Sequence, residues 1–180
     1  MVTFAGPLAA YDFGAEAPSA FTLEHCWGVL LGTEHSARFS VNGPSRLETQ
    51  GTLWGGNLAM VAHLVGTPYF PRIDGGILFL EDVGEHPYRI ERMLYQLHHS
   101  GVLSRQRAVL LGAFNDYELG ANDNGYDLAA MIEHCRHAFD LPIFTGLPFG
   151  HCRDKLTLPV GGRCALSVEQ GAARLTLSDY

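Results

Sequence analysis

The sequence predicts an α/β domain in which parallel core strands carry flanking helices and antiparallel strands are added at both ends. Continuous apolar runs such as Ile77–Leu80 are typical of strands that are covered on both faces. Between these runs, apolar residues recur at helical spacing, so strands and helices alternate along the middle of the chain. Strand–helix–strand order implies parallel pairing through right-handed crossovers.

Composition limits the classes of function. The chain has 180 residues, of which 47% are apolar and 17% are charged, which fits one soluble domain with a sizeable core. We take residues 1–180 as that domain and residues 1–20 as its leading segment. The net charge of −7 argues against a nucleic-acid surface. The apolar runs are too short to cross a bilayer and no secretory leader is recognised, so no membrane partner is expected.

The cysteines bear on the cellular compartment. Cys26, Cys135, Cys152 and Cys164 are scattered and form no Cys-x-x-Cys pair. In a compact α/β chain, this pattern is typical of buried thiols in a reducing compartment. We therefore expect a cytoplasmic protein.

The first part of the chain predicts a short β start, a loop, a helix and two strands. Residues 3–5 are β-like, residues 11–20 are loop-like, and Thr22 is the expected N-cap of a helix that Gly32 ends. Residues 37–41 and 47–54 are predicted as strands.

Hydrophobic periodicity and helix-boundary signals also predict the elements of the core and of the carboxyl end. Predicted helices cover residues 58–65, run from Pro87 to a stop at Gly101, and cover residues 127–139. Predicted strands cover residues 77–80, 108–114 and 142–145 in the core, and residues 156–160, 164–168 and 174–177 at the carboxyl end.

Two titratable residues stand at the predicted carboxyl ends of core strands, where ligands gather in open parallel sheets. Glu81 ends the most apolar strand, and His151 follows a loop rich in glycine and proline. A charge at the rim of an apolar layer is costly unless it is paired. A carboxylate beside an imidazole fixes the ring tautomer and raises its basicity, as a general base requires. We expect the two side chains to approach each other; the alternative is that each is an ordinary polar residue.

The run Trp54-Gly55-Gly56-Asn57 is a second candidate, for substrate binding. A Gly-Gly-Asn start to a helix exposes backbone N–H groups that could bind a peptide carboxylate. A tight strand-to-helix turn explains the same residues equally well. Trp54 would either wall the pocket or pack in the core.

One helix has the spacing of a metal site. His134 and His137 lie three residues apart, with Glu133 and Cys135 nearby. Cys135 falls on the apolar stripe of this helix, whereas the histidines fall beside or opposite it. A solvated helix face is therefore favoured, and we expect no metal and no other cofactor.

Five segments then occur in a recognisable order. They are Trp54–Leu58, Gly66–Tyr69, Ile77–Asp82, Pro148–His151 and Leu156–Pro159. This order resembles the C-terminal domain of the LD-carboxypeptidases, the muramoyltetrapeptide carboxypeptidase family, which also includes microcin C immunity peptidases. The likeness extends from Gly6-Pro7 to about residue 161.

The resemblance implies a swivelling β/β/α-type domain and a Ser-His-Glu triad in which Glu81 and His151 supply the acid and the base. It implies release of terminal D-alanine from cytoplasmic muramoyl tetrapeptides during peptidoglycan recycling, without a metal. In this family the serine would lie in a preceding N-terminal nucleophile domain, which is absent here. Ser45 and Ser104 of this chain lack the small flanking residues of a nucleophile elbow. Expected partners are that domain, a muropeptide and, since family members are often dimers, a second copy.

Three other interpretations stay open. A non-catalytic module that binds muropeptides or a protein would not need a histidine and a glutamate within hydrogen-bond reach. A microcin-type peptide-nucleotide amidase would belong to the same family. A thiol enzyme would use Cys152, but side chains of adjacent residues in an extended loop point apart, so His151 would not activate it.

Overall fold

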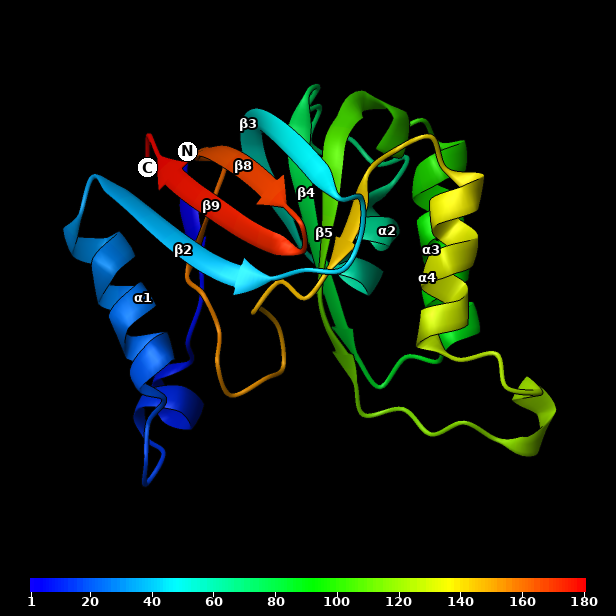
Figure 1. Ribbon diagram of the computed structural model, residues 1–180, viewed down its shortest axis with the longest axis horizontal. Helices are drawn as coiled ribbons and strands as arrows, with labels where there is room; N and C mark the ends of the chain where they lie inside the picture. The colour runs from blue at the N-terminus through cyan, green and yellow to red at the C-terminus, as the bar shows by residue number, and fades with distance from the viewer.

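A seven-stranded mixed sheet organises the molecule, with strand order β2-β9-β8-β3-β4-β5-β6 (Figure 1). The computed structural model describes residues 1–180. The strands of this sheet are β2 (Glu34–Ser40), β3 (Arg46–Asn57), β4 (Gly76–Val83), β5 (Gln106–Asn115), β6 (Ile143–Thr145), β8 (Arg163–Glu169) and β9 (Ala172–Ser178). A separate pair, β1 (Thr3–Ala5) and β7 (Leu158–Val160), is antiparallel.

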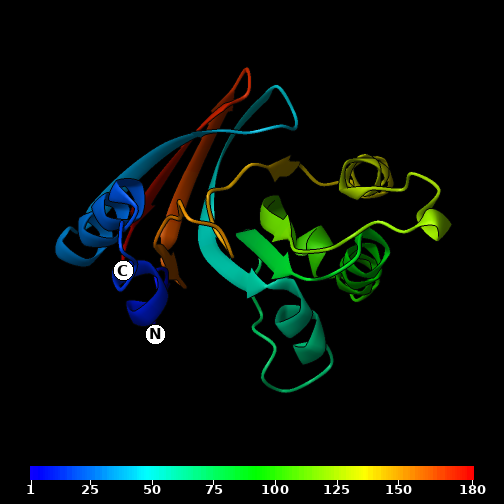
Figure 2. The same cartoon turned by 90° about the horizontal axis from the view of Figure 1, so that it is seen from below.

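Strand β3 joins the two halves of the sheet. Its first part, Arg46 to Thr52, pairs antiparallel with β8, and its second part, Leu53 to Asn57, pairs parallel with β4. β4, β5 and β6 continue the parallel half, whereas β8, β9 and β2 form the antiparallel half. Figure 2 shows the antiparallel strands curving away from the parallel ones. The predicted α/β class, with parallel core strands and antiparallel strands near the ends, is confirmed.

Helices cover the parallel half on one face. α2 (Leu58–Leu64), α3 (Pro87–His99) and α4 (Leu128–Ala138) pack there, and α1 (Ala20–Leu31) lies beside β2 at the other end of the molecule (Figure 1). Short turns complete the chain: a π-helical turn, η1 (Ala9–Phe13), and the 3-10 turns η2 (Leu103–Arg105) and η3 (Ala121–Asp123). None of the helices combines the length and the apolar character needed to cross a bilayer.

Alternation along β4 divides the core in two. Leu78 and Leu80 face the helices α2, α3 and α4, and Ile77 and Phe79 face the inner side of the antiparallel strands. All four side chains are fully buried, because residues of a strand point alternately to the two faces of the sheet. The same alternation continues into Glu81 and Asp82, which therefore lie on opposite faces at the carboxyl end of β4.

Three details differ from the sequence-based predictions. α1 begins at Ala20 with Ser19 as its N-cap, because Ser19 Oγ accepts from the backbone N–H of Thr22 at 3.1 Å. Residues 9–13 form η1, in a segment partly expected to be a loop. β3 continues beyond the expected end at residue 54, through Gly55 and Gly56 to Asn57, so the tight turn that was one of the two interpretations of these residues is absent. Asn57 ends the strand and is the N-cap of α2.

Candidate active site

The carboxyl end of β4 and the loop after β6 bring Glu81 and His151 together. His151 Nδ1 lies 2.9 Å from Glu81 Oε2, within hydrogen-bond distance, although the residues are 70 positions apart in the sequence. The Glu81 side chain is 7% exposed and the His151 side chain is 56% exposed. The carboxylate is therefore fixed at the edge of the core, and the imidazole extends from it toward solvent. The expected approach of the two side chains is observed.

Glycine at position 150 allows this approach. Gly150 has φ +112°, and a Cβ built on it would lie 2.9 Å from both Cβ and Oε2 of Glu81. The preceding Phe149 anchors the loop, because its ring packs edge-on against Phe79 with centroids 5.0 Å apart. The backbone N–H of Ala113 also donates to the carbonyl oxygen of Phe149 at 2.8 Å. A side chain at position 150 would push His151 away from its carboxylate.

The second oxygen of Glu81 is held by Asn57. The Asn57 side-chain amide donates to Glu81 Oε1 at 3.3 Å and to Asp82 Oδ1 at 2.8 Å. Asp82 is 4% exposed and also accepts from the backbone N–H groups of Ala59 and Val83, each at 2.9 Å. Asn57 Oδ1 accepts from the backbone N–H of Met60 at 3.1 Å. One amide thus links two buried carboxylates to the first turn of α2, where N–H groups favour negative charge.

The backbone of His151 is held from the neighbouring strand. Asn115, the last residue of β5, donates from Nδ2 to the carbonyl oxygen of His151 at 2.6 Å. Neither Asp82 nor Asn115 was among the predicted site residues. The position of Asp82 next to Glu81 was the available signal, whereas Asn115 depends on the irregular register between β4 and β5.

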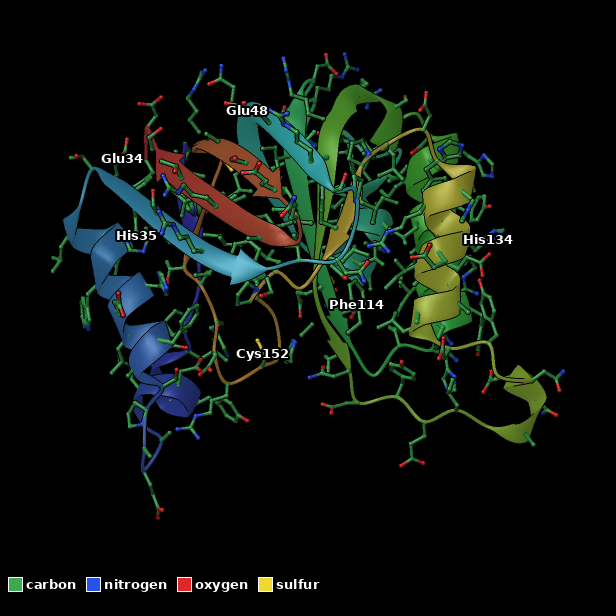
Figure 3. The ribbon with its side chains drawn as sticks, in the orientation of Figure 1. Glu34, His35, Glu48, Phe114, His134 and Cys152 are labelled. Atoms are coloured by element: carbon green, nitrogen blue, oxygen red, sulfur yellow. The ribbon has the colours of Figure 1, made fainter.

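Cys152 lies on the same loop, as Figure 3 shows. Burial raises the pKa of the Cys152 thiol; Lys155 acts in the opposite direction, and the carboxylates of Asp154, Glu81 and Asp12 add to the increase. The Cys152 Sγ atom lies 3.2 Å from the carbonyl oxygen of Asp154. A protonated, hydrogen-bonded thiol is a poor nucleophile, which argues against the thiol-enzyme interpretation.

The predicted substrate-binding run lies beside the pair but makes mainly internal contacts. Trp54 is 4% exposed, and its Nε1 donates to Gln106 at 2.8 Å. Gly55 has φ +137° and lies so close to Phe79 that a Cβ would meet the Phe79 carbonyl oxygen at 1.8 Å. Gly56 has φ +135° with nothing within 4 Å of its Cβ position. Gly55, Gly56 and Asn57 are partly exposed, and of the two glycines Gly56 has open space around its Cβ position. Substrate binding by this run stays a prediction.

The histidines of α4 lie away from the pair. His134, labelled on α4 in Figure 3, lies 2.9 Å from the Tyr95 hydroxyl and 3.5 Å from Glu91 Oε1. His137 Nδ1 lies 2.6 Å from the carbonyl oxygen of Glu133 in its own helix. No cluster of three or more histidine, cysteine, aspartate or glutamate side chains is arranged to hold a metal ion.

The geometry defines what the pair can do chemically. An ionised carboxylate only accepts hydrogen bonds, so Glu81 selects the tautomer with hydrogen on Nδ1 of His151. The lone pair of Nε2 then points away from Glu81, and no side chain or backbone group of the chain is hydrogen-bonded to this atom. An imidazole held in this way can take a proton from a nucleophile that approaches from outside the chain.

Comparisons with known proteins show which family the chain resembles. The family described as LD-carboxypeptidase C-terminal domain matches residues 50–166. A murein tetrapeptide carboxypeptidase of Pseudomonas aeruginosa is 33% identical over 77% of this chain and 45% of its own length. The crystal structure of muramoyltetrapeptide carboxypeptidase from Oxalobacter formigenes is 49% identical with a TM-score of 0.95, over 99% of this chain and 62% of that one.

A more distant structure shares the fold alone. The microcin C7 self immunity protein MccF is 19% identical with a TM-score of 0.81, over 100% of this chain and 61% of that one. The chain spans about half the length of the curated relatives that it matches.

Proposed function

The chain belongs to the LD-carboxypeptidase family, as its C-terminal domain, and we propose that Glu81 and His151 supply the acid and the base of a serine carboxypeptidase. The substrate that we propose is a muramoyl tetrapeptide, from which the enzyme releases the terminal D-alanine. The hydrogen bond of 2.9 Å between Glu81 and His151 is the observation that carries this proposal. A non-catalytic module has no need to leave Nε2 of an oriented imidazole free.

We propose that the nucleophilic serine comes from an N-terminal domain outside this chain. In the first step, His151 Nε2 takes the hydroxyl proton while the serine oxygen attacks the carbonyl carbon of the bond to D-alanine. The imidazolium then returns this proton to the nitrogen of D-alanine, the C–N bond breaks, and an acyl-enzyme remains. Water, deprotonated by the same imidazole, hydrolyses the ester and restores the serine. Glu81 stabilises the imidazolium in both halves of the reaction.

The wider setting is part of the same proposal. The cleaved bond would join the L-centre of a diamino acid, usually meso-diaminopimelate, to D-alanine. The reaction would occur in the cytoplasm during peptidoglycan recycling. It would need no cofactor, and the active protein would be a homodimer.

Release of D-alanine tests the function. The protein that contains this chain and its preceding domain is incubated with a muramoyl tetrapeptide, and free D-alanine is quantified by chromatography. We expect release by the wild type, no release by this chain alone, and loss of release in His151→Ala. The matched control is His137→Ala on α4, which should keep wild-type activity. A peptide-nucleotide amide, tested in parallel, reports microcin-type activity. Release that persists in His151→Ala would overturn the assignment of the base.

A further inference from the structure

A buried ion pair joins two distant parts of the chain close to the site. Lys155 Nζ lies 2.9 Å from Asp12 Oδ1 and 3.2 Å from Oδ2. The side chains are 8% and 7% exposed, and the residues are 143 positions apart. Asp12 also accepts from the backbone N–H of Leu8 at 2.7 Å, and the Tyr11 ring centroid lies 5.8 Å from Lys155 Nζ. Burying two charges is costly even when they are paired, so such a pair adds little net stability. It favours the one geometry in which the two charges stay paired.

Lys155 lies at the base of the loop that carries His151. The backbone N–H of Leu156 donates to the carbonyl oxygen of Pro148 at 2.7 Å, which closes residues 148–156 into a loop, here called the His151 loop. In Figure 1 this segment hangs below the sheet between β6 and β7, next to the N-terminal residues and α1. The ion pair therefore connects η1 to the His151 loop.

Further contacts connect the same two segments. Thr22 Oγ1 donates to the carbonyl oxygen of Arg153 and accepts from the backbone N–H of Lys155, both at 3.0 Å. Ser19 Oγ donates to Asp154 Oδ1 at 2.6 Å. Arg153 Nη2 donates to the carbonyl oxygen of Ala17 at 3.2 Å. Three consecutive residues of the loop are thus held by residues 12–22.

The contacts with residues 12–22 explain how the His151 loop is ordered. The His151 side chain is 56% exposed, and one hydrogen bond to Glu81 fixes its ring. A single hydrogen bond does not order a nine-residue loop against its conformational entropy. Asn115 holds the backbone at His151 itself, but residues 153–155 need other partners.

We propose that the contacts of Asp12, Ser19, Thr22 and the Ala17 carbonyl group with residues 153–155 form a clamp. This clamp, which includes the Asp12–Lys155 ion pair, keeps His151 within hydrogen-bond distance of Glu81. Lys155 and Asp12 are then positioning residues, which touch no substrate and act through the backbone of the loop. The catalytic consequence rests on the function proposed above, whereas the ordering of the loop does not.

The main test removes both charges of the clamp together. The double variant Asp12→Asn/Lys155→Met keeps the stems of both side chains and leaves no unpaired buried charge. Thr22→Val is the second variant, because it removes the hydroxyl that bonds two backbone groups of the loop and keeps the shape of the side chain. The control is Leu94→Ala on α3, in the core on the far side of the parallel strands, which lowers stability without touching the clamp.

Two readouts are compared on the protein with its preceding domain, at a temperature where all variants are folded. Amide hydrogen exchange of residues 150–156 should be at least about tenfold faster in both clamp variants than in the control. The value of kcat should fall by about 10²-fold in the double variant, because a displacement of roughly 1 Å has this effect, while KM stays unchanged.

The outcomes distinguish positioning of His151 by the clamp from a general effect on stability. If both clamp variants match Leu94→Ala in exchange and in kcat, the clamp does not position His151 and the inference fails. If the wild type releases no D-alanine, the proposed function fails, yet the exchange rates still decide whether these residues order the loop.

Discussion

The two members of the proposed pair lie in very different surroundings. Glu81 lies near the carboxyl end of β4, where the preceding Ile77, Leu78, Phe79 and Leu80 are fully buried, and both of its carboxylate oxygens are hydrogen-bonded. His151 lies on an irregular loop, with more than half of its side chain exposed. The hydrophobic core therefore positions the acid, whereas polar contacts position the base. We expect substitutions around Glu81 to lower stability and substitutions around His151 to lower activity.

Replacement of His151 itself should give the largest effect and the sharpest contrast. His151→Ala should lower kcat/KM by about 10³- to 10⁴-fold, because general base catalysis is lost. Because the side chain is largely exposed, the free energy of unfolding should change by no more than about 0.5 kcal/mol. Steady-state kinetics and urea unfolding measure the two quantities. A drop in stability comparable to the loss of activity would show that His151 is structural and would break the comparison.

Gly150→Ala should lower both stability and activity. The methyl group would meet Glu81 at 2.9 Å, and alanine would have to adopt φ +112°. We expect a loss of about 1–3 kcal/mol in stability from backbone strain. We also expect roughly a 10²-fold loss of kcat, because the ring moves from its carboxylate. Gly125→Ala is the matched control for positive φ, since Gly125 has φ +80° and open space around its Cβ position, away from the pair. Equal kcat values in the two variants would contradict the close-approach argument.

Asp82→Ala should act mainly on stability. It removes an acceptor from the backbone N–H of Ala59 and from the Asn57 side-chain amide, and both donors are partly buried at the start of α2. An unpaired buried donor costs about 1–3 kcal/mol, so urea unfolding should show a loss in that range. Activity should fall only through the freedom that Asn57 and Glu81 gain, by less than in Gly150→Ala. A larger loss of activity than in Gly150→Ala would mean that Asp82 takes part in the chemistry directly.

His25, which packs between α1 and β2, should make stability depend on pH. Burial, and next the positive charge of His35, lower the pKa of His25 below its usual 6.5, against an opposing effect of Glu24. His25 Nδ1 lies 2.7 Å from His35 Nε2. Because the unfolded chain then binds a proton more readily than the folded one, stability is full above pH 6.5 and falls as the pH drops below this value.

The slope of this fall is at most about 1.4 kcal/mol per pH unit for one proton. His25→Gln should flatten the profile between pH 7.5 and 5.5 in urea unfolding, whereas His137→Gln on the exposed side of α4 should leave it unchanged. A profile that keeps its slope in His25→Gln would assign the proton to another group.

The sequence predicted the elements well where hydrophobic periodicity alone determines them. The apolar run at 77–80 and the stripe after Pro87 are β4 and α3. It also placed Glu81 and His151 at the same edge: Glu81 lies near the carboxyl end of β4, and His151 is on the loop after β6. Local capping was less predictable. Ser19 and Thr22 are both good N-caps, and Ser19 caps α1 while the Thr22 hydroxyl contacts the His151 loop 131 residues away.

The surroundings of the pair depend on strand register, which the sequence does not show. Asn57 reaches Glu81 because the two residues are register partners of β3 and β4. A tight turn was one of two interpretations of the glycines before Asn57, but they form part of β3, where Gly55 passes too close to Phe79 for any side chain. Asp12 and Lys155 lie far apart in the sequence, and no periodic pattern links them.

The tautomer of His151 tests the central relation between the two residues most directly. Nitrogen-15 NMR of the imidazole at neutral pH distinguishes a protonated from an unprotonated ring nitrogen. We predict hydrogen on Nδ1 and a free Nε2, with the preference lost in Glu81→Gln. Hydrogen on Nε2 in the wild type, or the same spectrum with and without the Glu81 carboxylate, would contradict the account.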